Sequence, residues 1–101
     1  MPQPRRTLLE TRTSAPPADV LERAKRFFAG RNSIYAAYVE REGPQYVTLR
    51  GQGGEELIVH AMPGPGEGSG SAVTGSSYLF DAQIARFFAT LPPAAATWEG
   101  A

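Results

Sequence analysis

The stretch between residues 33 and 80 consists of four short runs of apolar or alternating residues, separated by clusters of glycine and proline. Runs of this length are typical of β-strands, and connections this short favour antiparallel hairpins. With a similar run near the N-terminus, we expect five strands, over residues 7–13, 33–41, 45–50, 55–62 and 71–80. Strands of this kind are stable only as a sheet that buries one face, so the rest of the chain has to supply a cover.

Two segments with helical periodicity supply that cover. Apolar residues recur at helical spacing in both segments, at Val20, Leu21, Ala24, Phe27 and Phe28 and again at Ile84, Phe87, Phe88 and Leu91. We expect Ser14 to cap the first helix ahead of two prolines, and Gly30 to end it. Asp81 is expected to cap the second helix, which should end near Leu91 because a proline follows.

The element order β-α-β-β-β-β-α therefore predicts an α+β fold of two layers, a five-stranded antiparallel sheet with two helices on one face. A single α+β domain should span residues 7–91, with an N-terminal extension over residues 1–6 and a Pro/Ala tail over residues 92–101. This layout resembles the TATA-binding-protein-like (TBP-like) fold and the helix-grip domains, which include START and polyketide-cyclase-like proteins. The resemblance rests on layout and on no residue motif, so it implies the fold and assigns no functional residue.

The composition excludes several common kinds of catalytic and metal-binding site. The absence of cysteine excludes thiolate catalysis, cysteine-ligated zinc and iron–sulfur clusters, and a single histidine, His60, excludes a histidine-rich metal site within one chain. The glycine run over residues 63–70 contains no lysine and precedes a strand rather than a helix, which favours a plain hairpin loop over a phosphate-binding loop. The sequence therefore predicts a protein that is not an enzyme and that has no cofactor and no metal site.

Charge and hydropathy give weak evidence on location and partners. Ten basic and ten acidic residues cancel, which argues against a dedicated nucleic-acid binder, although residues 1–31 carry seven basic and three acidic side chains. An asymmetry of this size can orient a domain against an anionic partner, or it can be a chance distribution on solvated faces. No stretch approaches the ~20 apolar residues of a membrane span, and the N-terminus lacks the apolar run of a signal peptide. We therefore expect the cytoplasm, with a peripheral place on a membrane complex left open.

The candidate partner-binding residues lie on the wetter sheet face and in the two tails. Tyr35, Tyr46 and Ile58 are expected on the sheet face that the helices do not cover, where they would expose apolar surface. Trp98, the sole tryptophan, stands in a Pro/Ala tail, where it could anchor the chain in a partner's pocket or fold back on its own domain. Three basic residues near the N-terminus complete the set: Arg5, Arg6 and Arg12.

These features favour an accessory or structural subunit that docks on a larger protein assembly through its sheet face and extended termini. The cytoplasmic side of a membrane complex is one such assembly. The main alternative, implied by the helix-grip resemblance, is a carrier or sensor of an apolar ligand held among the aromatic residues near both helices. A weaker alternative is nucleic-acid binding through the N-terminal arginines, and a homodimer also stays open.

Overall fold

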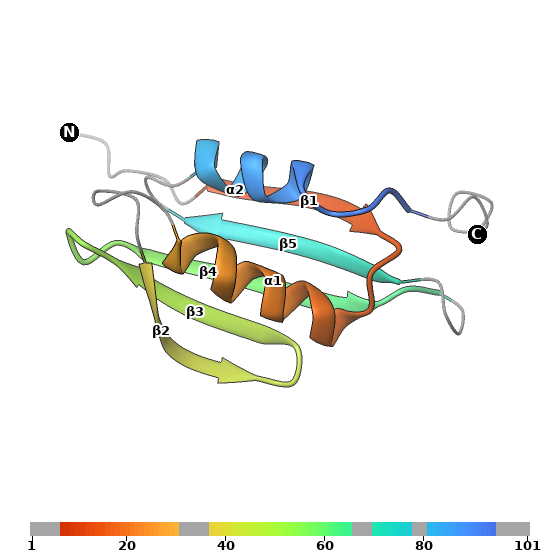
Figure 1. Cartoon of the computed structure of the whole chain (residues 1–101), viewed down its shortest axis with the longest axis horizontal. Coiled ribbons are helices and arrows are strands. Elements are labelled where there is room, and N and C mark those ends of the chain that lie inside the picture. The colour runs from red at the N-terminus through yellow and green to blue at the C-terminus, as the bar shows by residue number, and fades with distance from the viewer. Residues whose placement is uncertain (1–6, 31–36, 66–69, 78–80, 95–101) are drawn as a thin grey trace.

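The computed structural model describes residues 7–30, 37–65, 70–77 and 81–94. Its elements follow the predicted order and are, with their bounds, β1 (Thr7–Thr13), α1 (Pro17–Ala29), β2 (Ala37–Gly43), β3 (Tyr46–Gly51), β4 (Glu56–Pro63), β5 (Ser71–Ser77) and α2 (Asp81–Ala89). The strands form one antiparallel sheet in the order β1-β5-β4-β3-β2. Both helices lie on the same side of this sheet, α1 across its middle and α2 beside β1 (Figure 1). The predicted two-layer α+β fold is thereby confirmed.

The first helix begins later than predicted. Its N-cap is Pro16, whose carbonyl accepts the backbone N–H of Val20, and no side chain caps the helix. Ser14 lies before this residue in an irregular turn, so the expected serine cap is wrong. Pro17 occupies the first helical position, where its missing N–H costs nothing, and the two prolines therefore set the start without a polar cap. The helix ends at Ala29, as Gly30 predicted.

Several boundaries differ from the predicted ones by two or three residues. The turn expected at residues 42–44 falls at Pro44 and Gln45, so that β2 continues to Gly43. α2 ends at Ala89, and Leu91 closes a tighter turn by donating its N–H to the Phe88 carbonyl. β5 reaches at least Ser77. The N-terminal part of the strand predicted over 33–41 and the last three residues of the one predicted over 71–80 lie outside the described residues.

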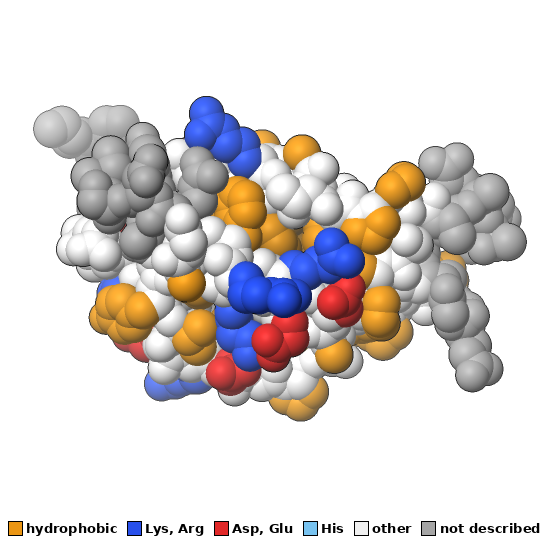
Figure 2. All heavy atoms as spheres, in the orientation of Figure 1, with side chains coloured by type: hydrophobic (Ala, Val, Ile, Leu, Met, Phe, Trp, Pro, Cys, Tyr) orange, Lys and Arg blue, Asp and Glu red, His pale blue; other side chains and the backbone are white. Residues whose placement is uncertain are grey.

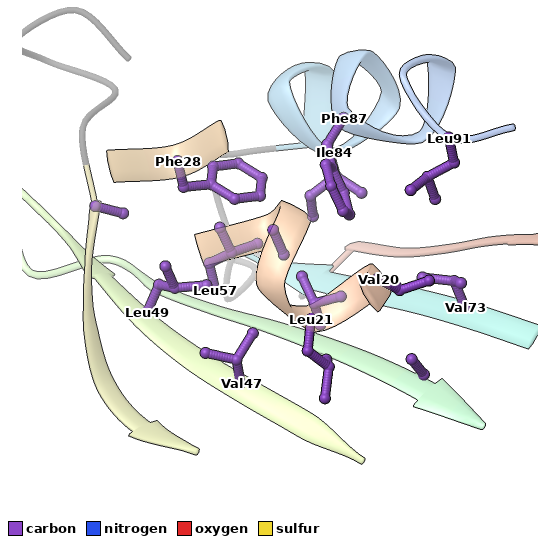
Figure 3. Packing of buried hydrophobic residues seen from close by; sticks show 14 of the residues in the cluster. Val20, Leu21, Phe28, Val47, Leu49, Leu57, Val73, Ile84, Phe87 and Leu91 are labelled. Carbon is purple, nitrogen blue, oxygen red and sulfur yellow. The ribbon is translucent and has the colours of Figure 1, made fainter. Parts of the chain in front are cut away.

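The core fills the space between the helices and the sheet (Figure 3). The rings of Phe28 and Phe87 are fully buried, with centroids 5.8 Å apart, and join α1 to α2 above the sheet. Alternate strand residues supply the floor of the core, among them Val47, Leu49, Leu57, Val59 and Val73. Because strand side chains alternate between faces, this fixes which residues of each strand point away from the helices.

Two contacts tie the helical layer to the β1–β5 side of the sheet. The hydroxyl of Thr13, at the end of β1, donates to the carbonyl of Pro92 just beyond α2 at 2.6 Å. Gly75 of β5 lies under α2 so closely that a Cβ there would stand 2.6 Å from Cγ2 of Ile84. The absence of a side chain at Gly75 therefore lets α2 approach the sheet.

Within the described ranges, no helix combines the length and apolar character that crossing a lipid bilayer requires.

Candidate functional site: the open face of the sheet

One face of the sheet has no element of the described chain packed on it, and we call it the open face. Its residues follow from the strand register and from the burial of their neighbours in each strand. They are Leu8, Glu10 and Arg12 of β1, Ala72, Thr74 and Ser76 of β5, Glu56, Ile58, His60 and Met62 of β4, Tyr46, Thr48 and Arg50 of β3, and Tyr38 and Arg41 of β2.

The open face exposes large apolar side chains. Leu8 is 61% exposed, Tyr38 59% and Met62 45%, and these three are spread over strands at both edges and in the middle. Tyr46 and Ile58 lie between them and are half-buried by their neighbours. An antiparallel sheet with one solvated face normally places polar residues there. This face instead mixes apolar, hydroxyl and charged side chains, as surfaces that bind other proteins do.

The structure places three of the seven predicted partner-binding residues on this face. Tyr46 and Ile58 occupy adjacent strands, since Tyr46 pairs with His60 and Thr48 pairs with Ile58. Arg12 is exposed on β1, two strands away from Ile58. The other four, Arg5, Arg6, Tyr35 and Trp98, lie outside the described residues. The sheet therefore brings together the central pair and adds Arg12 at the edge.

An ion-pair cluster borders the β2 side of the open face. Arg50 Nη2 lies 2.7 Å from Glu40 Oε2 and 3.9 Å from Glu56 Oε2, and its Nη1 donates to the Gly54 carbonyl. The hydrogen bond from Arg50 lowers the pKa of Glu40, and the same contact raises the pKa of Arg50. A hollow of about 220 Å³ lies at this cluster. The carboxylates of Glu40 and Glu56 are paired with the guanidinium of Arg50. Charges paired in this way are typical of the solvated rim of an interface rather than of a catalytic centre.

A second hollow lies at the opposite edge of the sheet, where β1 pairs with β5. It has a volume of about 430 Å³ and is lined by β1 and β5, with the small residues Ala72 and Thr74 beside Glu10 and Arg12. Since an acid and a base flank small residues, the hollow suits a neighbouring polar side chain or strand better than an apolar ligand. Among the described residues, no group of three histidine, aspartate or glutamate side chains could hold a metal ion. His60 lies on the open face with its ring centroid 5.9 Å from that of Tyr46.

The opposite surface, formed by the helices, has a different character. Figure 2 shows basic and acidic side chains intermixed over α1, with apolar atoms between them. Lys25 Nζ lies 2.7 Å from Glu22 Oε1 of its own helix and 3.0 Å from Glu42 Oε1 of β2. Hydrogen bonds to these two carboxylates raise the pKa of Lys25. Asp19 pairs with Arg23 at 2.8 Å. Charges paired within one chain in this way are typical of a solvated surface.

The aromatic residues near the helices pack against one another. The centroids of Phe27 and Phe28 are 5.0 Å apart, those of Phe27 and Phe87 5.5 Å, and those of Phe87 and Phe88 6.1 Å. Phe28 and Phe87 are fully buried and belong to the core. These four rings therefore serve as packing for one another, and neither hollow described above is lined by them.

Three exposed side chains on the open face, those of Leu8, Met62 and Tyr38, were not predicted from the sequence. Leu8 lies two residues from Glu10 in β1, and Met62 lies two residues from His60 in β4. Residues two apart in a strand share a face, so the sequence could have placed Leu8 and Met62 on the open face. Tyr38 could not be placed in this way, because the register of β2 shifts between Val39 and Arg41.

We compared the chain with protein-family models, with curated proteins and with solved structures, and no match was found. The resemblance to the TBP-like and helix-grip folds therefore stays a prediction.

Proposed function

We propose that this chain is a non-enzymatic accessory subunit that docks on a larger protein assembly through the open face of its sheet. The observation that carries the proposal is the combination of a helix-covered face with an open face that exposes Leu8, Tyr38 and Met62. Burying apolar surface of this kind against a partner is favourable by roughly 25 cal/mol per Å². The mixed polar residues around it supply the rim that such interfaces use.

The extended termini form the second part of the proposal. The hydroxyl of Thr13 donates to the carbonyl of Pro92, so the described part of the C-terminal tail starts beside the end of β1. We propose that Trp98 and the N-terminal Arg5 and Arg6 extend the docking surface. The cytoplasmic side of a membrane complex is the kind of assembly that we propose to examine first.

The test is the native size of the chain at its natural expression level, measured separately in the soluble and membrane fractions of its own cells. We expect co-migration with a large complex. A face variant, Tyr38→Lys with Met62→Lys, should migrate as the free chain because it places two charges in the proposed interface. A matched control, Ala29→Lys with Ala85→Lys, adds the same charge to exposed positions of the helices and should leave the complex intact.

The tail needs its own variants. Trp98→Ala, and a chain ending at Ala94, leave the hydrogen bond between Thr13 and Pro92 in place. If both stay in the complex, Trp98 is no anchor. If the wild-type chain migrates as a free monomer or dimer in both fractions, the docking proposal is wrong, and extraction of an apolar ligand from the purified protein then tests the carrier alternative.

A further inference from the structure

The outer edge of β1 carries backbone groups that point away from the sheet. The N–H of Gly64 donates to the carbonyl of Gly70 at 2.8 Å, and hydrogen-bonded pairs alternate along an antiparallel ladder. The backbone N–H and C=O groups of even-numbered residues of β5 therefore point to β4, and those of odd-numbered residues such as Val73 point to β1. Val73 pairs with Thr11, so Thr11 turns its backbone groups inward. The N–H and C=O groups of Leu8, Glu10 and Arg12 consequently point outward.

No strand within the described ranges pairs with this outer edge. Edge strands whose backbone groups point outward are templates for pairing with a further strand unless charge, proline or a bulge blocks them. β1 contains no proline, and its register with β5 is continuous over all seven residues. Its charged residues, Glu10 and Arg12, are opposite in sign and two positions apart.

The opposite signs make β1 complementary to itself. A two-fold axis at Thr11 that pairs β1 antiparallel with β1 of a second copy places Glu10 opposite Arg12 of that copy, and Arg12 opposite its Glu10. Both pairs lie at positions where backbone groups face the new partner, so each can combine two backbone hydrogen bonds with one ion pair. An axis at Glu10 would instead oppose two glutamates, which is unfavourable.

We propose that β1 pairs in this register with β1 of a second copy, giving a homodimer with one continuous sheet. The proposal goes beyond the docking function above because it uses the backbone edge of β1, although the side chains of Glu10 and Arg12 also lie at the rim of the open face. Arg12 also makes an interaction within its own chain, and its guanidinium has five N–H donors, enough to bind a further carboxylate. β2 does not offer the same arrangement, because a register shift between Val39 and Arg41 interrupts it.

Charge reversal tests the register. In Glu10→Arg, and separately in Arg12→Glu, both symmetry-related pairs become repulsive, so we expect the dimer dissociation constant to rise by about 10- to 100-fold. Mixing the two variants opposes arginines with glutamates again and should restore a heterodimer. The double variant Glu10→Arg with Arg12→Glu should restore the homodimer. Arg41→Glu, an exposed reversal on the opposite edge strand, is the matched control and should dimerise like the wild type.

Sedimentation of the full chain measures these constants at low ionic strength, where ion pairs are least screened. A wild-type chain that stays monomeric up to about 1 mM overturns the proposal. A dimer that neither single reversal weakens, or whose reversals are not rescued by mixing, also overturns it and places the contact elsewhere.

A single cysteine gives an independent readout, since the chain has none of its own. The register places the two Thr11 residues opposite each other with Cα atoms about 4.5 Å apart, a distance that a disulfide can span. Thr11→Cys should therefore form a covalent dimer under mild oxidation. Leu8→Cys is the control: Leu8 is more exposed than Thr11, but the two copies would stand about 20 Å apart. Cross-linking that is faster at position 8 than at position 11 contradicts the register.

Discussion

The close approach of α2 to β5 over Gly75 gives the most stringent test of the packing. In Gly75→Ala the new Cβ would lie 2.6 Å from Cγ2 and 3.3 Å from Cδ1 of Ile84, a side chain with no exposed surface. Normal contacts between carbon atoms are about 3.5–4.0 Å, so α2 or the strand has to move by roughly 1 Å. Overpacking of this kind costs about 1–3 kcal/mol. The φ angle at Gly75 is not positive, so alanine recovers about 0.5–1 kcal/mol from the less flexible unfolded chain.

The net expectation for Gly75→Ala is a loss of about 0–2.5 kcal/mol in the free energy of unfolding, or up to roughly 15 °C in the melting temperature. A double-mutant cycle with Ile84→Ala isolates the contact, because removing Cγ2 and Cδ1 removes the collision. We expect the double variant to lose less stability than the sum of the two single losses. Thr74→Ala, next to it on the open face, controls for the strand. Additive losses in this cycle would refute the close approach of α2.

The remaining predictions concern the core, a partly buried hydrogen bond and an ion pair. Phe87→Ala should lower the free energy of unfolding by about 3–5 kcal/mol, measured by denaturant titration, because it empties the junction of both helices with the sheet. Thr13→Val should lower it by about 1–3 kcal/mol, since the partly buried Pro92 carbonyl loses its donor, and Thr13→Ser should retain most of the stability. The contact with Arg50 depresses the pKa of Glu40, so its contribution is complete above the ordinary value of 4.5 and is lost as the pH falls through the lower native pKa. Acid unfolding of Arg50→Met should accordingly show a weaker pH dependence than that of the wild type.

The layers and most of the core were predictable because they depend on periodicity. The alternation of Leu57, Val59 and Ala61 assigned the packed face of β4, and the helical spacing of Ile84 and Phe87 assigned the buried face of α2. These patterns repeat over several residues, so an error in one boundary does not change which side is buried. The predicted faces are confirmed where the structure describes them.

Boundaries and edges depend on single residues, and there the prediction was weaker. Ser14 is a good capping residue, yet Pro16 and Pro17 place the helix start beyond its reach. The register shift in β2 lies between Val39 and Arg41, where no glycine or proline marks it in the sequence. Because of the shift, Tyr38 and Arg41 lie on the same face of the sheet although they are three residues apart. The hydrogen bond between Thr13 and Pro92 joins residues 79 positions apart, which no local pattern reveals.

The two edges of the sheet differ in a way that separates the two proposals. β2 combines a register shift with Glu40, held by Arg50, and both features oppose pairing with another strand. β1 has no register shift, so a second copy would join there and extend the open face without covering Tyr38 or Met62. The face variant, Tyr38→Lys with Met62→Lys, changes no residue of β1, so it should release the chain from its assembly while leaving the dimer intact. If Glu10→Arg released the chain and the face variant did not, the edge of β1 would be the docking surface.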